Sequence, residues 1–256
     1  MAITRRSTIG DVAARVSQAL TKAGITAVLT GGGAVSVYSA NKYQSYDIDF
    51  VTAASRRELS DVMCKLGFTQ GAGRHFEHPS TRLVVEFVAW PLTVGDEVVQ
   101  RWARIPTPAG LLQILTPTQC IKDRLAAFFH WRDSQSLEQA LLVGKTHRIS
   151  LMELARWSRA EGRAQDYEEF RRRLRSIRRV TGPAVSGMGA TKVSGWSVQP
   201  RRRRRNASAP KPTSISAMPM APPPPPPPVA VIGSGEQREK SSIAEAGCPV
   251  TLTSSV

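Results

Sequence analysis

The stretch TGGGAVSVYSANKYQSYDIDF, residues 30–50, places three consecutive glycines ahead of an Asp-Ile-Asp triplet. The short run before it, ITAVL, is apolar and rich in β-branched residues, whereas residues 34–42 show helical spacing of their apolar positions. The pattern therefore predicts a strand, a glycine turn and a helix. Residues 47–51 then predict a second strand that begins at the acidic triplet.

The two aspartates of the triplet are predicted to share one face of that second strand. Residues i and i+2 of a strand project from the same side, so Asp47 and Asp49 would lie about 7 Å apart along it. Two carboxylates on one spot repel each other unless a cation lies between them. Oxygen ligands of this kind suit Mg²⁺, which completes its coordination with substrate phosphates.

A third acid strengthens the prediction of a metal site. Glu86 interrupts the apolar run LVVEFV, where a lone charge is costly unless it is paired, bound to a metal or on a solvated face. On a strand beside Asp47 and Asp49, it would let two ions be held, or would accept the proton of an attacking hydroxyl. We predict a site for Mg²⁺, with Mn²⁺ as the alternative ion, formed by these three residues.

The glycines predict a site for phosphate. Gly31, Gly32 and Gly33 lie between a strand and a helix, so backbone N–H groups at the helix start can face an anion, and the missing Cβ atoms allow close approach. The rival interpretation is a dinucleotide-binding fingerprint. Two details disfavour it: its third glycine would fall at Ser36, and the acids stand at the start of a strand rather than at its end.

The rest of the chain predicts an α+β fold followed by a tail. Residues 1–115 alternate predicted strands and helices and form the core domain, whereas the pattern over residues 116–181 is helical throughout and predicts a second domain. Residues 182–256 hold 13 of the 18 prolines and no Phe or Tyr. A segment of this composition cannot bury enough apolar surface to fold, so we predict disorder. Other predicted elements are a helix over 8–23 capped at Ser7 or Thr8, a helix capped at Ser55, a hairpin around 78–80, a strand over 98–105, a strand over 111–115 and a helix after Thr116.

Net charge and cysteine content indicate which partners and which cellular compartment to expect. The formal net charge is +15, of which the tail carries +6 and the first 181 residues carry +9. Such a surplus favours a polyanionic partner, although a solvated basic face is the commoner cause. Three cysteines far apart in sequence predict a reduced, cytoplasmic protein. The first residues show no secretion signal and no run reaches the length of a membrane span, so we expect no membrane association.

The combination of these motifs resembles the DNA polymerase β-like nucleotidyltransferase superfamily. The strand, glycine turn, helix, acidic strand and later third acid are all present, and the chain looks most like the small prokaryotic branch of AbiEii/AbiGii-type toxins. The resemblance implies that Asp47, Asp49 and Glu86 form the metal and catalytic site and that the glycines hold the nucleotide. It further implies that Lys122 contacts nucleotide phosphate, and that a minimal nucleotidyltransferase core precedes the helical domain.

The same resemblance implies an activity and its partners. A nucleoside monophosphate would move from an NTP to a hydroxyl of RNA, including tRNA, or of protein, in the manner of a toxin with a cognate antitoxin or of a phage-defence enzyme. The chain differs from the family pattern at Gly33, where many members have Ser, and at Tyr43, where the toxin branch has Arg and Lys42 is the nearest substitute. Asp133 and Glu138 both compete for the late acid of the helical domain.

A second interpretation treats the chain as an inactive nucleotidyltransferase-like module that binds nucleic acid or protein. The three retained acids argue against it, because a module that binds a polyanion has no need of carboxylates facing its ligand.

Overall fold

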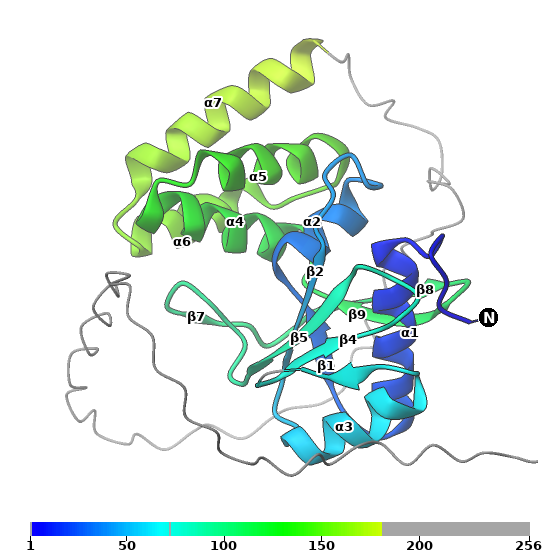
Figure 1. The fold of residues 1–256 in the computed structure, drawn as a ribbon. Coiled ribbons are helices and arrows are strands. Elements are labelled where there is room, and N and C mark those ends of the chain that lie inside the picture. Colours follow the sequence, from blue (N-terminus) through cyan, green and yellow to red (C-terminus); the bar gives the residue numbers. More distant parts are fainter. Residues whose placement is uncertain (1, 72, 181–256) are drawn as a thin grey trace, which may run out of the picture. The chain divides into compact units, whose positions relative to one another are not determined.

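The computed structural model describes residues 2–71 and 73–180, which form an α+β fold in which a mixed sheet is flanked by helices (Figure 1). The predicted tail, residues 182–256, lies outside the described residues, so its disorder stays a prediction. Within the described ranges, no helix combines the length and apolar character needed to cross a membrane.

The elements follow one another in the predicted order, with strands concentrated in the first part of the chain and helices in the second. The helices are α1 (Ile9–Lys22), α2 (Gly31–Tyr38), α3 (Arg56–Lys65), α4 (Pro117–Trp131), α5 (Ser134–Thr146), α6 (Leu151–Ala160) and α7 (Ala164–Val180). The strands are β1 (Ala27–Leu29), β2 (Asp47–Thr52), β3 (Thr69–Gln70), β4 (His75–Glu77), β5 (Val84–Ala89), β6 (Thr93–Val94), β7 (Glu97–Val98), β8 (Ala103–Thr107) and β9 (Gly110–Ile114).

The main sheet is mixed and has the strand order β3-β4-β5-β2-β1-β9-β8. β2 is parallel to β5 and antiparallel to β1, and β1 is parallel to β9. The pairs toward the two edges, β3–β4, β4–β5 and β8–β9, are antiparallel. β6 and β7 form a separate hairpin. The acidic strand β2 therefore lies in the interior of the sheet, where both neighbours fix its register.

Side-chain alternation divides β2, β4 and β5 into a buried face and an open one. Ile48, Phe50, Val85, Phe76 and Phe87 are each at most 1% exposed. The ring of Phe87 stacks on Phe50 at 5.9 Å between centroids and meets Phe76 edge-on at 5.6 Å. Because alternate strand residues face opposite ways, this core holds the acids on the other face.

Helix starts agree with the capping signals of the sequence. α1, α3 and α4 each begin with a capping box, in which the cap hydroxyl accepts from a backbone N–H three residues on and the side chain there accepts in return. The pairs are Thr8 with Asp11, Ser55 with Glu58, and Thr116 with Gln119. The predicted caps at Thr8, Ser55 and Thr116 are confirmed.

Two predicted elements have different bounds. The helix expected over 34–42 begins three residues earlier, so the glycines form its first turn, and it ends at Tyr38 because Ala40 and Asn41 adopt φ values of 52° and 60°. The single strand expected over 98–105 is instead two strands. Its beginning pairs with β6 in the separate hairpin, whereas its end belongs to β8 and pairs with β9.

Helices α4 to α7 pack together and contact the first part of the chain through α2 (Figure 1). The Tyr38 hydroxyl donates to the Leu115 carbonyl at 2.5 Å, and His147 Nε2 lies 2.7 Å from the Tyr38 carbonyl. The contact of His147 with Tyr38 joins residues on both sides of the predicted domain boundary at 115/116, whereas the contact of Tyr38 with Leu115 lies within the first part. The division into two domains stays a prediction.

Candidate active site

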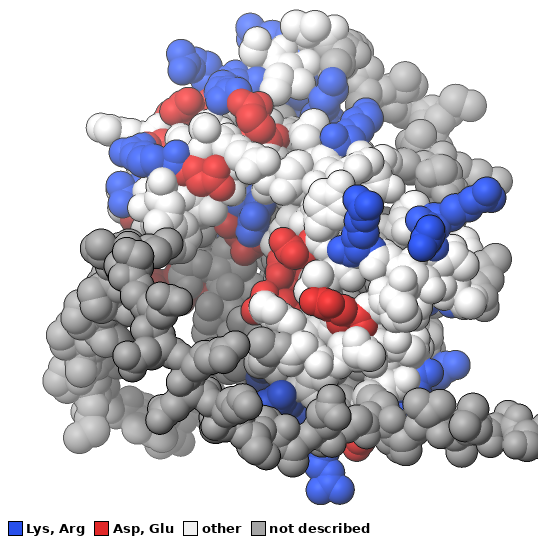
Figure 2. Space-filling model, viewed as in Figure 1, with Lys and Arg blue, Asp and Glu red and all other residues white. Residues whose placement is uncertain are grey.

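The strand register places the three predicted acids on one face of the sheet. Asp49 pairs with Glu86 across the parallel strands β2 and β5, and Asp47 precedes Asp49 by two residues. Paired residues of neighbouring strands point to the same side, so all three carboxylates leave the sheet on its open face. Figure 2 shows acidic side chains gathered over β2 and β5, on the face turned to the viewer.

The ionisation of Asp49 reflects this crowding. Its pKa is raised from 3.8 to about 6, and burial is the largest cause. The negative charges of Glu86 and then Asp47 raise it further, while the positive charge of Arg124 acts in the opposite direction. Because burial and the neighbouring negative charges disfavour the ionised form of Asp49, a bound cation would favour its ionisation.

The first glycine lies against the central carboxylate. Gly31 has a φ of 61°, in the left-handed region, and a Cβ on it would stand 2.4 Å from Asp49 Oδ2. The preceding Thr30 does not cap α2 with its side chain; its N–H and its hydroxyl both donate to the Asp49 carbonyl, at 2.9 and 3.3 Å. The start of α2 is therefore held directly beside Asp49, as the nucleotide-site prediction requires.

A short chain of hydrogen bonds positions the loop that enters β2. Ser36, which is fully buried, donates to the Gly32 carbonyl at 3.0 Å and accepts from the Ser45 N–H at 2.9 Å. The Ser45 hydroxyl in turn accepts from the Asp47 N–H at 3.2 Å. Ser36 thus links the glycine turn to the first aspartate. The residue that a dinucleotide fingerprint would require to be glycine has a structural function here.

Arg124 of α4 is a cation of the site that the sequence interpretation missed. It forms an ion pair with Asp123 at 2.8 Å, and the side chains of the pair are only 18% and 21% exposed. Burial alone would lower its pKa, but Asp123, with a smaller contribution from Asp49, raises the pKa above its ordinary value. Asp123 thus fixes the guanidinium whose charge acts on Asp49.

Lys122 is buried and forms two ion pairs within the described residues. Its side chain is 1% exposed, and its ammonium contacts Glu97 of β7 at 2.8 Å and Glu153 of α6 at 2.9 Å. Residues two apart on a helix point about 200° apart, so Lys122 and Arg124 leave α4 in opposite directions. Contact between Lys122 and nucleotide phosphate stays a prediction.

The three acids offer the oxygen ligands that Mg²⁺ prefers, but their present side-chain positions fit a single ion less well. Three oxygen ligands share one face, and their mutual repulsion contributes to the raised pKa of Asp49. Glu86, however, pairs with His75 of β4 at 3.0 Å. Among residues 2–71 and 73–180, no three His, Cys, Asp or Glu side chains are grouped closely enough to hold a metal ion. Coordination of one ion by all three acids would require Glu86 or Asp47 to reorient, whereas Mg²⁺ is commonly held by one or two carboxylates together with substrate phosphates.

The remaining predicted candidates have structural contacts. Asp133 caps α5 by accepting from the Gln135 N–H at 2.9 Å and the Ser136 hydroxyl at 2.6 Å. Glu138 forms an ion pair with Arg173 of α7. Tyr43 packs against the core beside Gly32. Neither competitor for the late acid is held toward β2 by these contacts.

Comparison with known proteins gives only distant similarity. No protein-family model matches the chain, and no curated protein matches it. The chain is similar to the crystal structure of an antigenic nucleotidyltransferase-like protein from Paracoccidioides brasiliensis, at 14% identity and a TM-score of 0.42, over 55% of this chain and 77% of that one. It is also similar to the antibiotic-resistance factor ANT(2'')-Ia in solution, at 14% identity and a TM-score of 0.37, over 68% and 94% of the two chains.

A crystal structure of ANT(2'')-Ia in complex with adenylyl-2''-tobramycin matches at 16% identity and a TM-score of 0.36, over 64% of this chain and 97% of that one. Identities and TM-scores in this range establish neither a family nor an activity. The function must therefore be argued from the residues of the site itself.

Proposed function

We propose that the chain is a Mg²⁺-dependent nucleotidyltransferase that moves a nucleoside monophosphate from an NTP to a hydroxyl. The observation that carries the proposal is the placement of Asp47, Asp49 and Glu86 on one open sheet face, with the start of α2 beside them. This arrangement combines ligands for a cation with backbone donors for a phosphate. Mn²⁺ is the alternative ion, and the acceptor is RNA, including tRNA, or protein.

Each group of the site has a defined task in this reaction. Asp47 and Asp49 would hold Mg²⁺, which when bound would neutralise charge on the phosphates. N–H groups at the start of α2 would bind phosphate oxygens, and Arg124 would offset their charge. The acceptor oxygen attacks the α-phosphorus while its proton passes to Glu86. The bond from the α-phosphorus to the bridging oxygen breaks, and pyrophosphate leaves with that electron pair.

His75 gives Glu86 a partner for this proton transfer. Its ring nitrogen lies 3.0 Å from the Glu86 carboxylate, and both side chains are nearly half exposed. The contact holds the carboxylate at the sheet surface, where an acceptor hydroxyl can approach. His78, the other histidine of this region, instead accepts from the Ser80 N–H at 3.1 Å and packs against Phe68.

A second candidate function is favoured by one observation. The pairing of Glu86 with His75 and the absence of a three-ligand group among residues 2–71 and 73–180 fit a module that binds nucleic acid or protein without catalysis. Such a module would bind its partner with or without Mg²⁺. The nucleotidyltransferase proposal instead requires the acids to bind the ion.

Label transfer tests the proposal. The protein is incubated with each α-labelled NTP, Mg²⁺, total RNA and protein, beside Asp49→Asn and the control Asp61→Asn, which removes an exposed carboxylate of α3. We expect transfer by the native protein and by the control, and a loss of at least about a hundredfold in Asp49→Asn. No transfer from any NTP to either acceptor would sink the proposal.

The biological setting of the proposal rests on sequence resemblance alone. A toxin of a toxin-antitoxin or phage-defence pair should arrest growth when expressed in the cytoplasm, and Asp49→Asn should abolish the arrest. Co-expression of an adjacent reading frame that encodes the antitoxin should restore growth. Arrest that persists in Asp49→Asn would separate toxicity from nucleotide transfer.

A further inference from the structure

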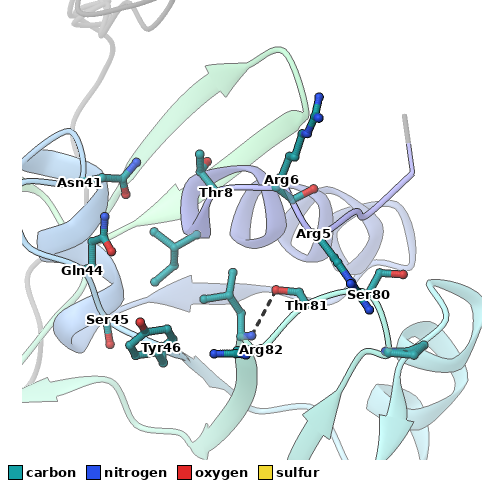
Figure 3. A pocket seen from close by; sticks show the side chains of 14 residues that line it. Arg5, Arg6, Thr8, Asn41, Gln44, Ser45, Tyr46, Ser80, Thr81 and Arg82 are labelled. Atoms are coloured by element: carbon teal, nitrogen blue, oxygen red, sulfur yellow. Dashed lines mark hydrogen bonds between the residues drawn. The ribbon is translucent and has the colours of Figure 1, made fainter.

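A basic cavity of about 650 Å³ adjoins the acidic face (Figure 3). Three segments form its wall: residues 5–9 at the start of α1, residues 41 and 44–46 between α2 and β2, and residues 79–83 between β4 and β5. The lining includes Arg5, Arg6 and Arg82, a set of hydroxyl and amide side chains, and no acid. Its chemistry is therefore that of a site for an anion.

The charge of the cavity is available to a ligand. No ion pair involves any of the three arginines within residues 2–71 and 73–180. The acid nearest to Arg5 and Arg6 along the chain, Asp11, is occupied by the capping box of α1, where it accepts from the Thr8 N–H at 2.9 Å and the Thr8 hydroxyl at 2.8 Å. Figure 3 shows Arg5 extended toward Ser80 and Thr81, whereas Arg6 points away from them.

The cavity meets the acidic site at the first residues of β2 and β5. Tyr46 lines the cavity and directly precedes Asp47, and its carbonyl accepts from the Val84 N–H at 3.0 Å. Ser45 also lines it, and its hydroxyl lies 3.1 Å from the position of a Cβ on Gly32. A ligand in the cavity would thus contact Ser45, which lies against Gly32 of the glycine turn, and Tyr46, which directly precedes the first aspartate.

An exposed aromatic ring completes the set of contacts. Tyr46 is 64% exposed, although large aromatic side chains are usually buried. A ring beside a basic groove is the arrangement by which proteins bind single-stranded nucleic acid, because bases stack on the ring while cations follow the phosphates. A protein acceptor would offer neither the regular negative charges nor the bases.

We propose that this cavity binds the phosphodiester backbone of single-stranded RNA, so that the acceptor hydroxyl lies at the end of a strand that runs past Tyr46 to Asp47. Arg5 and Arg82 contact phosphates, and Tyr46 stacks on a base. The inference deepens the proposed function by naming the acceptor as RNA rather than protein, and rests on it only for the reaction that follows binding.

Binding of a short labelled oligoribonucleotide by the full chain, without NTP or Mg²⁺, tests the inference. We expect Arg5→Gln/Arg82→Gln to bind roughly tenfold more weakly and to reduce the slope of log affinity against log salt by about 1.4, at about 0.7 per phosphate contact. Tyr46→Ala should weaken binding by about tenfold with the slope unchanged. The arginines of the tail are present in every variant, so their contribution cancels.

The matched control is Arg56→Gln/Arg57→Gln, which removes the same charge from exposed positions at the start of α3, beyond the opposite end of β2. Equal losses in the control and in Arg5→Gln/Arg82→Gln would overturn the inference, as would undiminished binding of a methylphosphonate strand with no backbone charge. The inference would also be overturned if label passed to a protein acceptor and Arg5→Gln/Arg82→Gln left that transfer unchanged. The proposed function would then stay intact. Arginine-dependent RNA binding without any NTP transfer would support the cavity and refute the transferase.

Discussion

At the scale of single residues, Gly31 has no room for a side chain, because its backbone lies against the Asp49 carboxylate. Any side chain at position 31 must adopt a φ of 61° and place its Cβ 2.4 Å from Asp49 Oδ2. We expect Gly31→Ala to destabilise the fold by about 1–3 kcal/mol, since it combines backbone strain with displacement of the carboxylate. Urea unfolding measures the loss.

Gly24 provides the control for that substitution. Its φ is 77°, but a Cβ there would meet no atom within 4 Å, so Gly24→Ala carries the strain alone. The loss in Gly31→Ala should exceed the loss in Gly24→Ala, and the excess should disappear in an Asp49→Ala background. An excess that survives removal of Asp49 would show that the carboxylate is not the group displaced.

The pKa of Asp49 makes stability depend on pH. Its value is about 6 in the fold against an ordinary value of 3.8, so the folded state binds more protons than the unfolded state between these values. Stability therefore falls as pH rises from about 4 to 6, by at most about 3 kcal/mol, and stays low above that range. Asp49→Asn, which lacks this penalty, should be about 1–3 kcal/mol more stable than the native protein at pH 7.5 and comparable to it at pH 4.

Urea unfolding at the two pH values checks the Asp49 prediction, with Asp61→Asn as an exposed aspartate for comparison. If the site binds Mg²⁺ only through ionised Asp49, NTP transfer should also fall as pH drops through about 6. The stability gain of Asp49→Asn over the native protein should be larger at pH 7.5 than at pH 4. An equal gain at the two pH values would contradict the electrostatic account of the site.

At the scale of elements, α4 shows what helical spacing could have predicted and what it could not. Lys122, Leu125 and Phe129 follow one another at intervals of three and four residues, so Lys122 belongs to the apolar face, and it is buried there. Its partners, Glu97 and Glu153, come from distant segments that no local pattern identifies. The same spacing places Arg124 on another face, but only the finished fold shows that its charge acts on Asp49.

Lys122→Gln and Arg124→Gln are expected to differ in their effect on KM for NTP. Lys122→Gln removes a buried ammonium from two carboxylates that are 41% and 36% exposed, so we expect a stability loss of about 2 kcal/mol with little change in KM for NTP. Arg124→Gln leaves Asp123, which is only 21% exposed, without its ion-pair partner, so we expect a loss of at least about 2 kcal/mol, but here together with a rise of about tenfold in KM for NTP. Unfolding and initial rates measure both variants. The reverse pattern would restore Lys122 as the nucleotide ligand.

At the scale of the whole molecule, the sequence predicted the strands that carry the three acids better than it predicted what surrounds them. Alternation in DIDF and the break in LVVEFV placed Asp47, Asp49 and Glu86 on strands, and the order of elements around the glycines is confirmed. The parallel pairing of β2 with β5, which makes Asp49 and Glu86 neighbours, joins segments separated by α3, β3 and β4. The basic cavity likewise combines three loops whose approach depends on the finished sheet, so no local pattern predicts it.

Binding of Mg²⁺ by the complete chain distinguishes the two candidate functions, because a ligand that binds only the folded state raises its stability. An ion at ten times its Kd adds about 1.4 kcal/mol, which for a chain of this size corresponds to roughly 3–6 °C in Tm. We expect that increase at pH 7.5, a smaller one at pH 5, where protons compete for Asp49, and none in Asp47→Asn/Asp49→Asn. NaCl at matched ionic strength controls for screening. An equal increase in the native protein and the double variant would show that the acids hold no ion, and would leave the binding module as the better account of the fold.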